Sequence, residues 1–184
     1  MSATSVLFLN HSSVIIQCDG EYLLCDPWFE KPAFGSWLPT FPMFNHPVYI
    51  ASLESKLSIL ISHGHDDHCD DDLLELFDKN TPIISSDFAS PSVKNRVKKI
   101  GFNNYHAVSE TGVQVGSFFV KSFRNEDISE DDAMYVIRTK DAVIIHCNDN
   151  WFPISEERVA EVKKEIAHVG EKNVIFMSQT NSAS

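Results

Sequence analysis

The chain has 184 residues, of which 43% are hydrophobic and 22% charged, as expected for one soluble globular domain over residues 1–184. Its formal net charge of −11 argues against nucleic acid as the main partner, because phosphate contacts need clustered Lys and Arg. No segment resembles a membrane span or a signal peptide. The four cysteines form no C-x-x-C pair, which fits reduced thiols, so we expect a cytoplasmic protein.

The first third of the chain predicts strands joined by turns and one long loop. Asp19-Gly20 is a typical hairpin turn between the second and third strands. The loop, residues 26–47, lacks periodicity, and its aromatic residues either pack it onto the core or line a pocket. These aromatic residues are Trp28, Phe29, Phe34, Trp37, Phe41 and Phe44. The predicted strands cover residues 6–9, 13–18, 22–25 and 58–62.

The rest of the chain alternates helices and strands. Helices are predicted from Asp70 onward, over residues 90–100 and over residues 155–169. The chain's basic cluster is interpreted as a solvated helix face; it consists of Lys94, Arg96, Lys98 and Lys99. Further strands are predicted over residues 82–85, 104–108, 113–123, 134–138, 142–147 and 173–178. This order predicts an α+β fold in which two sheets face each other with helices outside.

A run of metal-binding side chains directly follows the fourth predicted strand, in His63-Gly64-His65-Asp66-Asp67-His68. A buried strand can hold such a loop so that nitrogen and oxygen donors point to one place. His63 and His65 are two residues apart and project to the same side of an extended segment. Asp67 and His68 can face a second point, so the spacing predicts two metal ions. Asp66 is interpreted as an outward turn residue or as an acceptor for a ligand.

This motif resembles the signature of the metallo-beta-lactamase superfamily of metallohydrolases. A second stretch, Asp26-Pro27-Trp28-Phe29 followed by Pro32-Ala33-Phe34-Gly35 and Trp37, resembles a narrower branch. That branch contains the metal-binding domain of CMP-N-acetylneuraminate hydroxylases and their bacterial relatives. The resemblance covers about residues 5–184 and implies an αββα four-layer sandwich. It also implies C-terminal shortening, because the family continues past this point and supplies another histidine to the second metal.

The resemblance implies further site residues outside the motif. An aspartate at the end of a later strand bridges the two metals in the family, and Asp149 is the candidate here; its alternative role is that of a turn residue. Asp26 is expected to accept a hydrogen bond from the second nitrogen of a ligand histidine. His11 is expected to be a structural hydrogen-bonding histidine, with a place in the pocket wall as the alternative.

One expected ligand of the first metal is missing. The family's third histidine usually follows the strand that here ends at Phe123, where this chain has carboxylates instead. Asp127 is one candidate substitute and would favour metals that prefer oxygen ligands. His106 and His146 are the other candidates. An incomplete set of ligands binds metal more weakly and holds a single ion.

The leading functional prediction is a metal-dependent hydrolase that acts on an ester, phosphoester or amide in a small-molecule substrate. Asp67 and Asp149 would hold a metal-bound hydroxide, because a metal lowers the pKa of its bound water to about 7. Zinc is expected as one or two ions, with iron or manganese as alternatives. Two other functions stay open. One is a non-catalytic binding module with a degraded site, and the other is an oxygenase component that resembles the sialic-acid hydroxylases and needs a partner protein for its Rieske centre.

Overall fold

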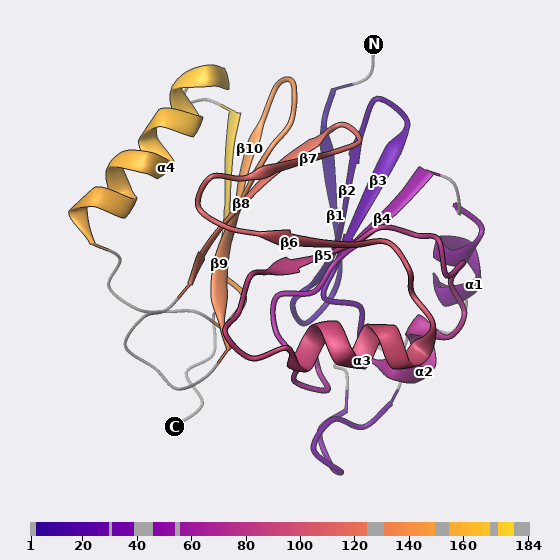
Figure 1. The fold of residues 1–184 in the computed structure, drawn as a ribbon. Coiled ribbons are helices and arrows are strands. Elements are labelled where there is room, and N and C mark those ends of the chain that lie inside the picture. The colour runs from indigo at the N-terminus through magenta and orange to yellow at the C-terminus, as the bar shows by residue number, and fades with distance from the viewer. Residues whose placement is uncertain are drawn as a thin grey trace.

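Two β-sheets face each other in the computed structural model, with helices on both outer sides (Figure 1). The structure describes residues 3–29, 31–38, 46–53, 56–124, 131–149, 155–169 and 173–178. The first sheet has the order β1 (Ser5–Asn10), β2 (Ser13–Cys18), β3 (Glu21–Cys25), β4 (Leu57–Leu60), β5 (Ile83–Ser86) and β6 (Tyr105–Val108). The second has the order β11 (Val174–Met177), β10 (Val143–His146), β9 (Ala133–Arg138), β8 (Phe118–Arg124) and β7 (Val113–Val115).

Strand direction changes within each sheet. Strands β1, β2 and β3 pair antiparallel, whereas β3, β4, β5 and β6 pair parallel. In the second sheet, β10 and β11 are parallel and the other pairs antiparallel. The described helices are α1 (His46–Ala51), α2 (Asp71–Leu74), α3 (Ser92–Ile100) and α4 (Glu156–Val169). Because β3, β4 and β5 run in the same direction, the loops after them leave from one edge of the sheet.

Apolar side chains fill three interfaces between four layers. Between the sheets, Ile16 and Leu23 pack in one cluster with Tyr135 and Ile144. A second cluster joins the other face of the first sheet to α2 and α3, and a third contains Val162 of α4 on the outer face of the second sheet. The predicted α+β class and the αββα sandwich are therefore confirmed. No helix among the described residues is long and apolar enough to cross a membrane.

The central strands of the first sheet are buried on both faces. In β2, Val14 and Ile16 belong to the cluster between the sheets, whereas Ile15 belongs to the helix-side cluster. In β4, Leu60 and Ile59 divide in the same way, because successive side chains of a strand point to opposite faces. Strands covered on both sides appear as continuous apolar runs in the sequence, which is why these strands were predictable.

The sequence prediction was wrong about one strand and missed one helix. The predicted strand over residues 113–123 is a hairpin of β7 and β8 that reverses at Gly116, whose φ is +52°. A Cβ atom on Gly116 would lie 2.5 Å from a carboxylate oxygen of Glu21, so only glycine fits there without rearrangement. Helix α1 begins at the end of the predicted loop and extends over residues for which no element was predicted, and the helix after Asp70 is a single turn.

Candidate metal centre

The six residues from His63 to His68, here called the histidine loop, follow β4 at the edge where the parallel strands end. The side chains of His63, Asp67 and His68 are buried, whereas His65 is exposed. The loop ends at helix α2, whose first turn is capped by Asp70: its carboxylate accepts hydrogen bonds from the backbone N–H of Asp72 and Leu73. The loop is therefore held by a core strand on one side and by a capped helix on the other.

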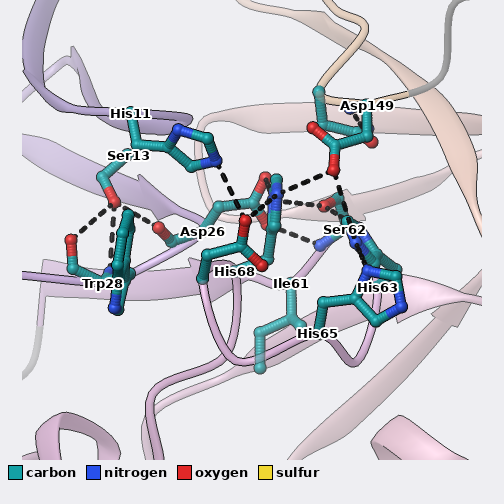
Figure 2. A network of polar contacts seen from close by, with 12 residues as sticks. His11, Ser13, Asp26, Trp28, Ile61, Ser62, His63, His65, His68 and Asp149 are labelled. Carbon is teal, nitrogen blue, oxygen red and sulfur yellow. Dashed lines mark hydrogen bonds and ion pairs between the residues drawn. The ribbon is translucent and has the colours of Figure 1, made fainter. Parts of the chain in front are cut away.

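The first group of donor atoms contains His63, His65 and Asp149. The distance from His63 Nε2 to His65 Nδ1 is 2.9 Å, and that from His63 Nε2 to Asp149 Oδ2 is 3.9 Å. One donor atom from each of the three residues lies within 4.8 Å of the others. The structure therefore brings together the residues predicted for the first metal and the predicted bridging carboxylate (Figure 2).

The second group lies on the other side of Asp149. His68 Nε2 is 3.3 Å from Asp149 Oδ2 and 3.8 Å from Asp67 Oδ2. Figure 2 shows Asp149 with contacts to both His63 and His68, so that one carboxylate lies between the two groups. His11 also reaches this group: its Nε2 is 3.2 Å from Asp67 Oδ2, and it forms a possible metal-holding set with His68 and Asp149. The sequence did not place His11 among the ligands.

Asp26 supports the second group from behind. Its fully buried carboxylate accepts a hydrogen bond from the Ser62 backbone N–H at 2.7 Å. It also lies 3.1 Å from His68 Nδ1 and 3.0 Å from His146 Nε2. Asp26 thus contacts the second nitrogen of a proposed ligand histidine, as expected. His146, one suggested replacement for the missing ligand, is paired with Asp26 and belongs to neither donor group, and nor does His106.

Unusual backbone conformations gather around these groups. Five described non-glycine residues have positive φ, and His11, Asp26 and Asn148 are three of them, at +49°, +47° and +42°. Asn148 is buried and donates from its side-chain amide to the Ala133 carbonyl, while its side-chain oxygen accepts from the Asp149 N–H. Such conformations cost about 1–3 kcal/mol each and persist where the surroundings enforce them, often at functional sites.

The charges of the centre suit a cation. Burial alone would raise the pKa of Asp26, but His68 and His146 outweigh it and hold that pKa well below its ordinary value. Burial acts in the same direction on Asp67 and Asp149, yet the nearby His11 and His68, respectively, lower both pKa values. These carboxylates are therefore ionised at neutral pH and concentrate negative charge between the sheets.

The two buried histidines differ in their protonation. Burial, with the neighbouring His68, lowers the pKa of His63 to about 3, so its imidazole is neutral, as a metal ligand must be. Burial opposes protonation of His68 as well, but the Asp26 and Asp149 carboxylates outweigh it and raise the pKa of His68 to about 10. In the metal-free protein His68 thus supplies the positive charge that a bound cation would supply instead.

A metal ion fits the side chains that are present. Two buried atoms of residues in the second group, Asp67 Oδ1 and His68 Nε2, have no hydrogen-bond partner, which is unusual for buried polar atoms. Histidine nitrogen and carboxylate oxygen are the donors that zinc and iron accept. The cited donor separations, 2.9–3.9 Å, bracket the edge of about 3.3 Å of a tetrahedron with metal–ligand bonds near 2.0–2.1 Å.

A pocket opens onto the first group. It has a volume of about 350 Å³ and is lined by His63, Gly64, His65, Ser92, Asp131, Asp132 and Asp149. Asp132 lies 3.9 Å from His63 Nδ1, and burial, together with the charge of Asp149, raises the pKa of Asp132 to about 7. Nothing in the sequence singles out Asp132 beyond its acidic surroundings. Asp127, the suggested carboxylate ligand, lies outside the described residues.

The aromatic residues of the predicted long loop divide into two kinds. Trp28 and Phe29 are buried and pack the loop onto the core, whereas Phe34 and Trp37 are half exposed. The Phe34 ring lies edge-on to His65 with 5.6 Å between the ring centres. The structure therefore supports packing for the first pair and a place beside the pocket for Phe34. Phe41 and Phe44 lie outside the described residues.

Arg96 of α3 binds the outer side of the histidine loop. Its Nη1 donates to the Gly64 carbonyl at 2.7 Å, its Nη2 to Asp66 at 3.0 Å and its Nε to Asp71 at 2.5 Å. The interpretation of Arg96 as part of a solvated basic face was therefore wrong, because helix α3 packs its side chain against the loop. Asp66, in contrast, points outward, which agrees with one of its predicted roles.

We expect Arg96→Lys to loosen the histidine loop. Lysine cannot reproduce the three hydrogen bonds that the planar guanidinium of Arg96 donates. The variant should therefore lose about 1–2 kcal/mol in the free energy of unfolding and bind zinc more weakly. Urea denaturation and zinc titration measure both effects. Lys99→Met on the same helix is the control, and we expect a change within about 0.5 kcal/mol. Equal behaviour of the two variants would contradict the role given to Arg96.

Comparisons with known proteins agree with this geometry. The family model described as "Beta-lactamase superfamily domain" matches residues 5–177. A Mycobacterium tuberculosis protein described as "Putative Rieske 2Fe-2S iron-sulfur protein" is 31% identical over 112 residues, which cover 60% of this chain and 21% of that protein. A metal-dependent hydrolase of Cereibacter sphaeroides is 30% identical over 112 residues, covering 60% of this chain and 45% of that protein.

Solved structures share the fold at low sequence identity. CmlA, a diiron β-hydroxylase from Streptomyces venezuelae, superposes with a TM-score of 0.63 at 18% identity. The match covers 86% of this chain and 32% of CmlA. The chain thus spans a minor part of each of these three relatives, 21% of the mycobacterial protein, 45% of the hydrolase and 32% of CmlA.

Proposed function

The chain belongs to the beta-lactamase superfamily, and on this premise we propose that it is a metal-dependent hydrolase with a two-metal centre. The family match also confirms the resemblance first seen in the histidine motif. The observation that carries the proposal is the position of Asp149, whose Oδ2 lies 3.9 Å from His63 Nε2 and 3.3 Å from His68 Nε2. In this proposal His63 and His65 hold the first ion, Asp67 and His68 hold the second, and Asp149 contacts both.

Zinc is the metal we propose, because histidine and carboxylate donors near tetrahedral spacing suit it. When bound, it supplies Lewis acidity that polarises a carbonyl or phosphoryl oxygen and makes a water molecule acidic at neutral pH. Asp67 and Asp149 would supply carboxylate ligands, and Asp26 holds the His68 ring so that Nε2 faces the centre. We also propose a cytoplasmic location, where a reducing environment keeps the four buried thiols free.

The substrate in this proposal is a small molecule with an ester, phosphoester or amide bond. A pocket of about 350 Å³ has the size of small-molecule sites. Its lining is acidic and would hold cations, which in turn would attract the oxygen atoms of the scissile group. The exposed Phe34 ring would contact an apolar part of the substrate.

A second candidate function is supported by two comparisons. The Mycobacterium tuberculosis relative is described as a Rieske iron–sulfur protein, and CmlA is described as a diiron enzyme. A histidine and carboxylate centre also accepts iron. In this alternative, the chain is an oxygenase component that receives electrons from a partner with an iron–sulfur centre.

Metal analysis of protein purified without a metal-binding tag tests the proposal. We expect about two equivalents of zinc per chain and metal-dependent turnover of bis(p-nitrophenyl) phosphate or p-nitrophenyl acetate. In the His63→Ala, His65→Ala double variant, metal content should fall by about one equivalent and turnover should be lost. Iron instead of zinc would favour the oxygenase component, and metal without any turnover would favour a binding module. Absence of bound metal in the unmutated protein would overturn the metal-dependent function.

A further inference from the structure

We propose that His11, on the turn between β1 and β2, is a ligand of the second metal ion together with Asp67, His68 and Asp149. This inference rests on the proposed two-metal centre and adds a ligand from a part of the chain that is 52 residues before the histidine loop begins. It supplies an imidazole at the ion for which the histidine loop provides only Asp67 and His68.

The donor atoms have the spacing that a small cation requires. His11 Nε2 lies 3.2 Å from Asp67 Oδ2, Asp67 Oδ2 lies 3.8 Å from His68 Nε2, and His68 Nε2 lies 3.3 Å from Asp149 Oδ2. His11, His68 and Asp149 each offer one donor atom within 4.8 Å of the others. A tetrahedral ion with bonds of 2.0–2.1 Å has donor–donor edges of about 3.3 Å. Small side-chain adjustments would therefore bring four donors onto one ion.

Unpartnered buried atoms point to a ligand at this place. His68 is fully buried, and its Nε2 has no hydrogen-bond partner. Asp67 is 3% exposed, and its Oδ1 is also without a partner. Leaving a buried polar atom unsatisfied is costly, and a cation bound at His68 Nε2 would remove that cost for this nitrogen.

The fold positions His11 beside Asp67 and His68. His11 has φ of +49° at the tip of the turn. The next strand begins with Ser13, whose buried hydroxyl donates to the Asp26 carbonyl and accepts from the Trp28 N–H. The His11 ring then packs edge-on against the rings of Trp28 and His68, with centre distances of 5.3 Å and 5.4 Å. These contacts fix the turn to the segment after β3 and bring His11 Nε2 to 3.2 Å from Asp67 Oδ2.

A purely structural role predicts different behaviour. If His11 only donates a hydrogen bond to Asp67, its removal would weaken the second ion without changing which atoms coordinate it. If His11 is a ligand, its removal also changes the coordination of that ion. Cobalt(II) reports this difference, because its visible spectrum depends on the number, type and geometry of its ligands.

The experiment is a titration of metal-free protein with cobalt(II) and with zinc, using wild type, His11→Asn and His106→Asn. Asparagine tolerates the positive φ at position 11, and His106 lies on β6 outside both donor groups. We expect the second equivalent to bind His11→Asn at least about 10-fold more weakly and to give an altered visible spectrum at saturation. His106→Asn should match wild type in both measurements. Should thermal melting show that His11→Asn does not fold, His11→Gln replaces it.

Each result decides between the two proposals. Wild type that binds no metal would end the proposed function. If wild type binds only one equivalent, a second metal ion is excluded, and with it the proposed ligand role of His11. A one-metal hydrolase would then remain. Two equivalents in wild type, with an unchanged second affinity or an unchanged saturated spectrum in the position-11 variant, would overturn the assignment of His11 alone.

Discussion

Asp26→Asn is expected to lower the affinity for metal by about 10- to 100-fold while the protein still folds. In the native protein the carboxylate of Asp26 accepts from His68 Nδ1 at 3.1 Å, which leaves Nε2 free to bind a metal. An asparagine amide would donate to Nδ1 instead and favour the tautomer that carries its proton on Nε2, the atom aimed at the centre. Competition titration with a chromophoric chelator measures the affinity.

A second substitution at position 26 separates the effect of Asp26 on the orientation of a ligand from its effect on the stability of the protein. Asp26→Ala removes the acceptor of the Ser62 N–H, leaves His68 without its buried counter-charge and removes the contact with His146 Nε2. Breaking a buried charge pair in this way costs about 3–5 kcal/mol, which urea denaturation should detect. Asp141→Asn, a substitution outside the centre, is the control and should leave metal affinity unchanged. Native affinity in Asp26→Asn would show that the carboxylate does not set the orientation of His68.

Local sequence was sufficient to predict the histidine loop. An apolar strand followed by donors at fixed spacing determines which side chains share a face, and His63 and His65 do meet, with 2.9 Å between their nearest ring nitrogens. Asp149 was predictable only through resemblance to a family, because nothing in its neighbourhood shows which strand end lies beside the loop. Its approach to His68 depends on the packing of one sheet against the other.

Features that depend on tertiary contacts were missed. His11 was predicted to be a structural hydrogen-bonding histidine or part of the pocket wall. Its proximity to Asp67 could not be foreseen, because it results from the way Ser13 ties the turn to the segment after β3. Gly116 was interpreted as part of a continuous strand because the Glu21 carboxylate, which packs against the turn at Gly116, lies far away in the sequence. Arg96 was misinterpreted because a charged residue on a helix gives no indication of the loop against which that helix packs.

Asp149→Ala is expected to reduce turnover by about 1,000-fold or more and to lower the metal content below that of any single histidine variant. Among the residues that the structure describes, Asp149 is the carboxylate that approaches both groups of donors, at 3.9 Å from His63 and 3.3 Å from His68. Its loss removes a ligand from each ion, and metals contribute several kcal/mol to stabilising a hydrolytic transition state, where about 1.4 kcal/mol corresponds to tenfold in rate. Metal analysis and turnover of bis(p-nitrophenyl) phosphate measure the two effects.

Asp131→Asn provides the matched control, because Asp131 lines the same pocket, while its carboxylate accepts a hydrogen bond from the Ser92 hydroxyl and belongs to neither donor group. That variant should keep both metal equivalents. A general effect of negative charge in the pocket would weaken metal binding in both variants, whereas a bridging role affects only Asp149→Ala. If Asp149→Ala instead retains two equivalents with native affinity, the two groups of donors do not share this carboxylate, and the centre must be described as two independent sites.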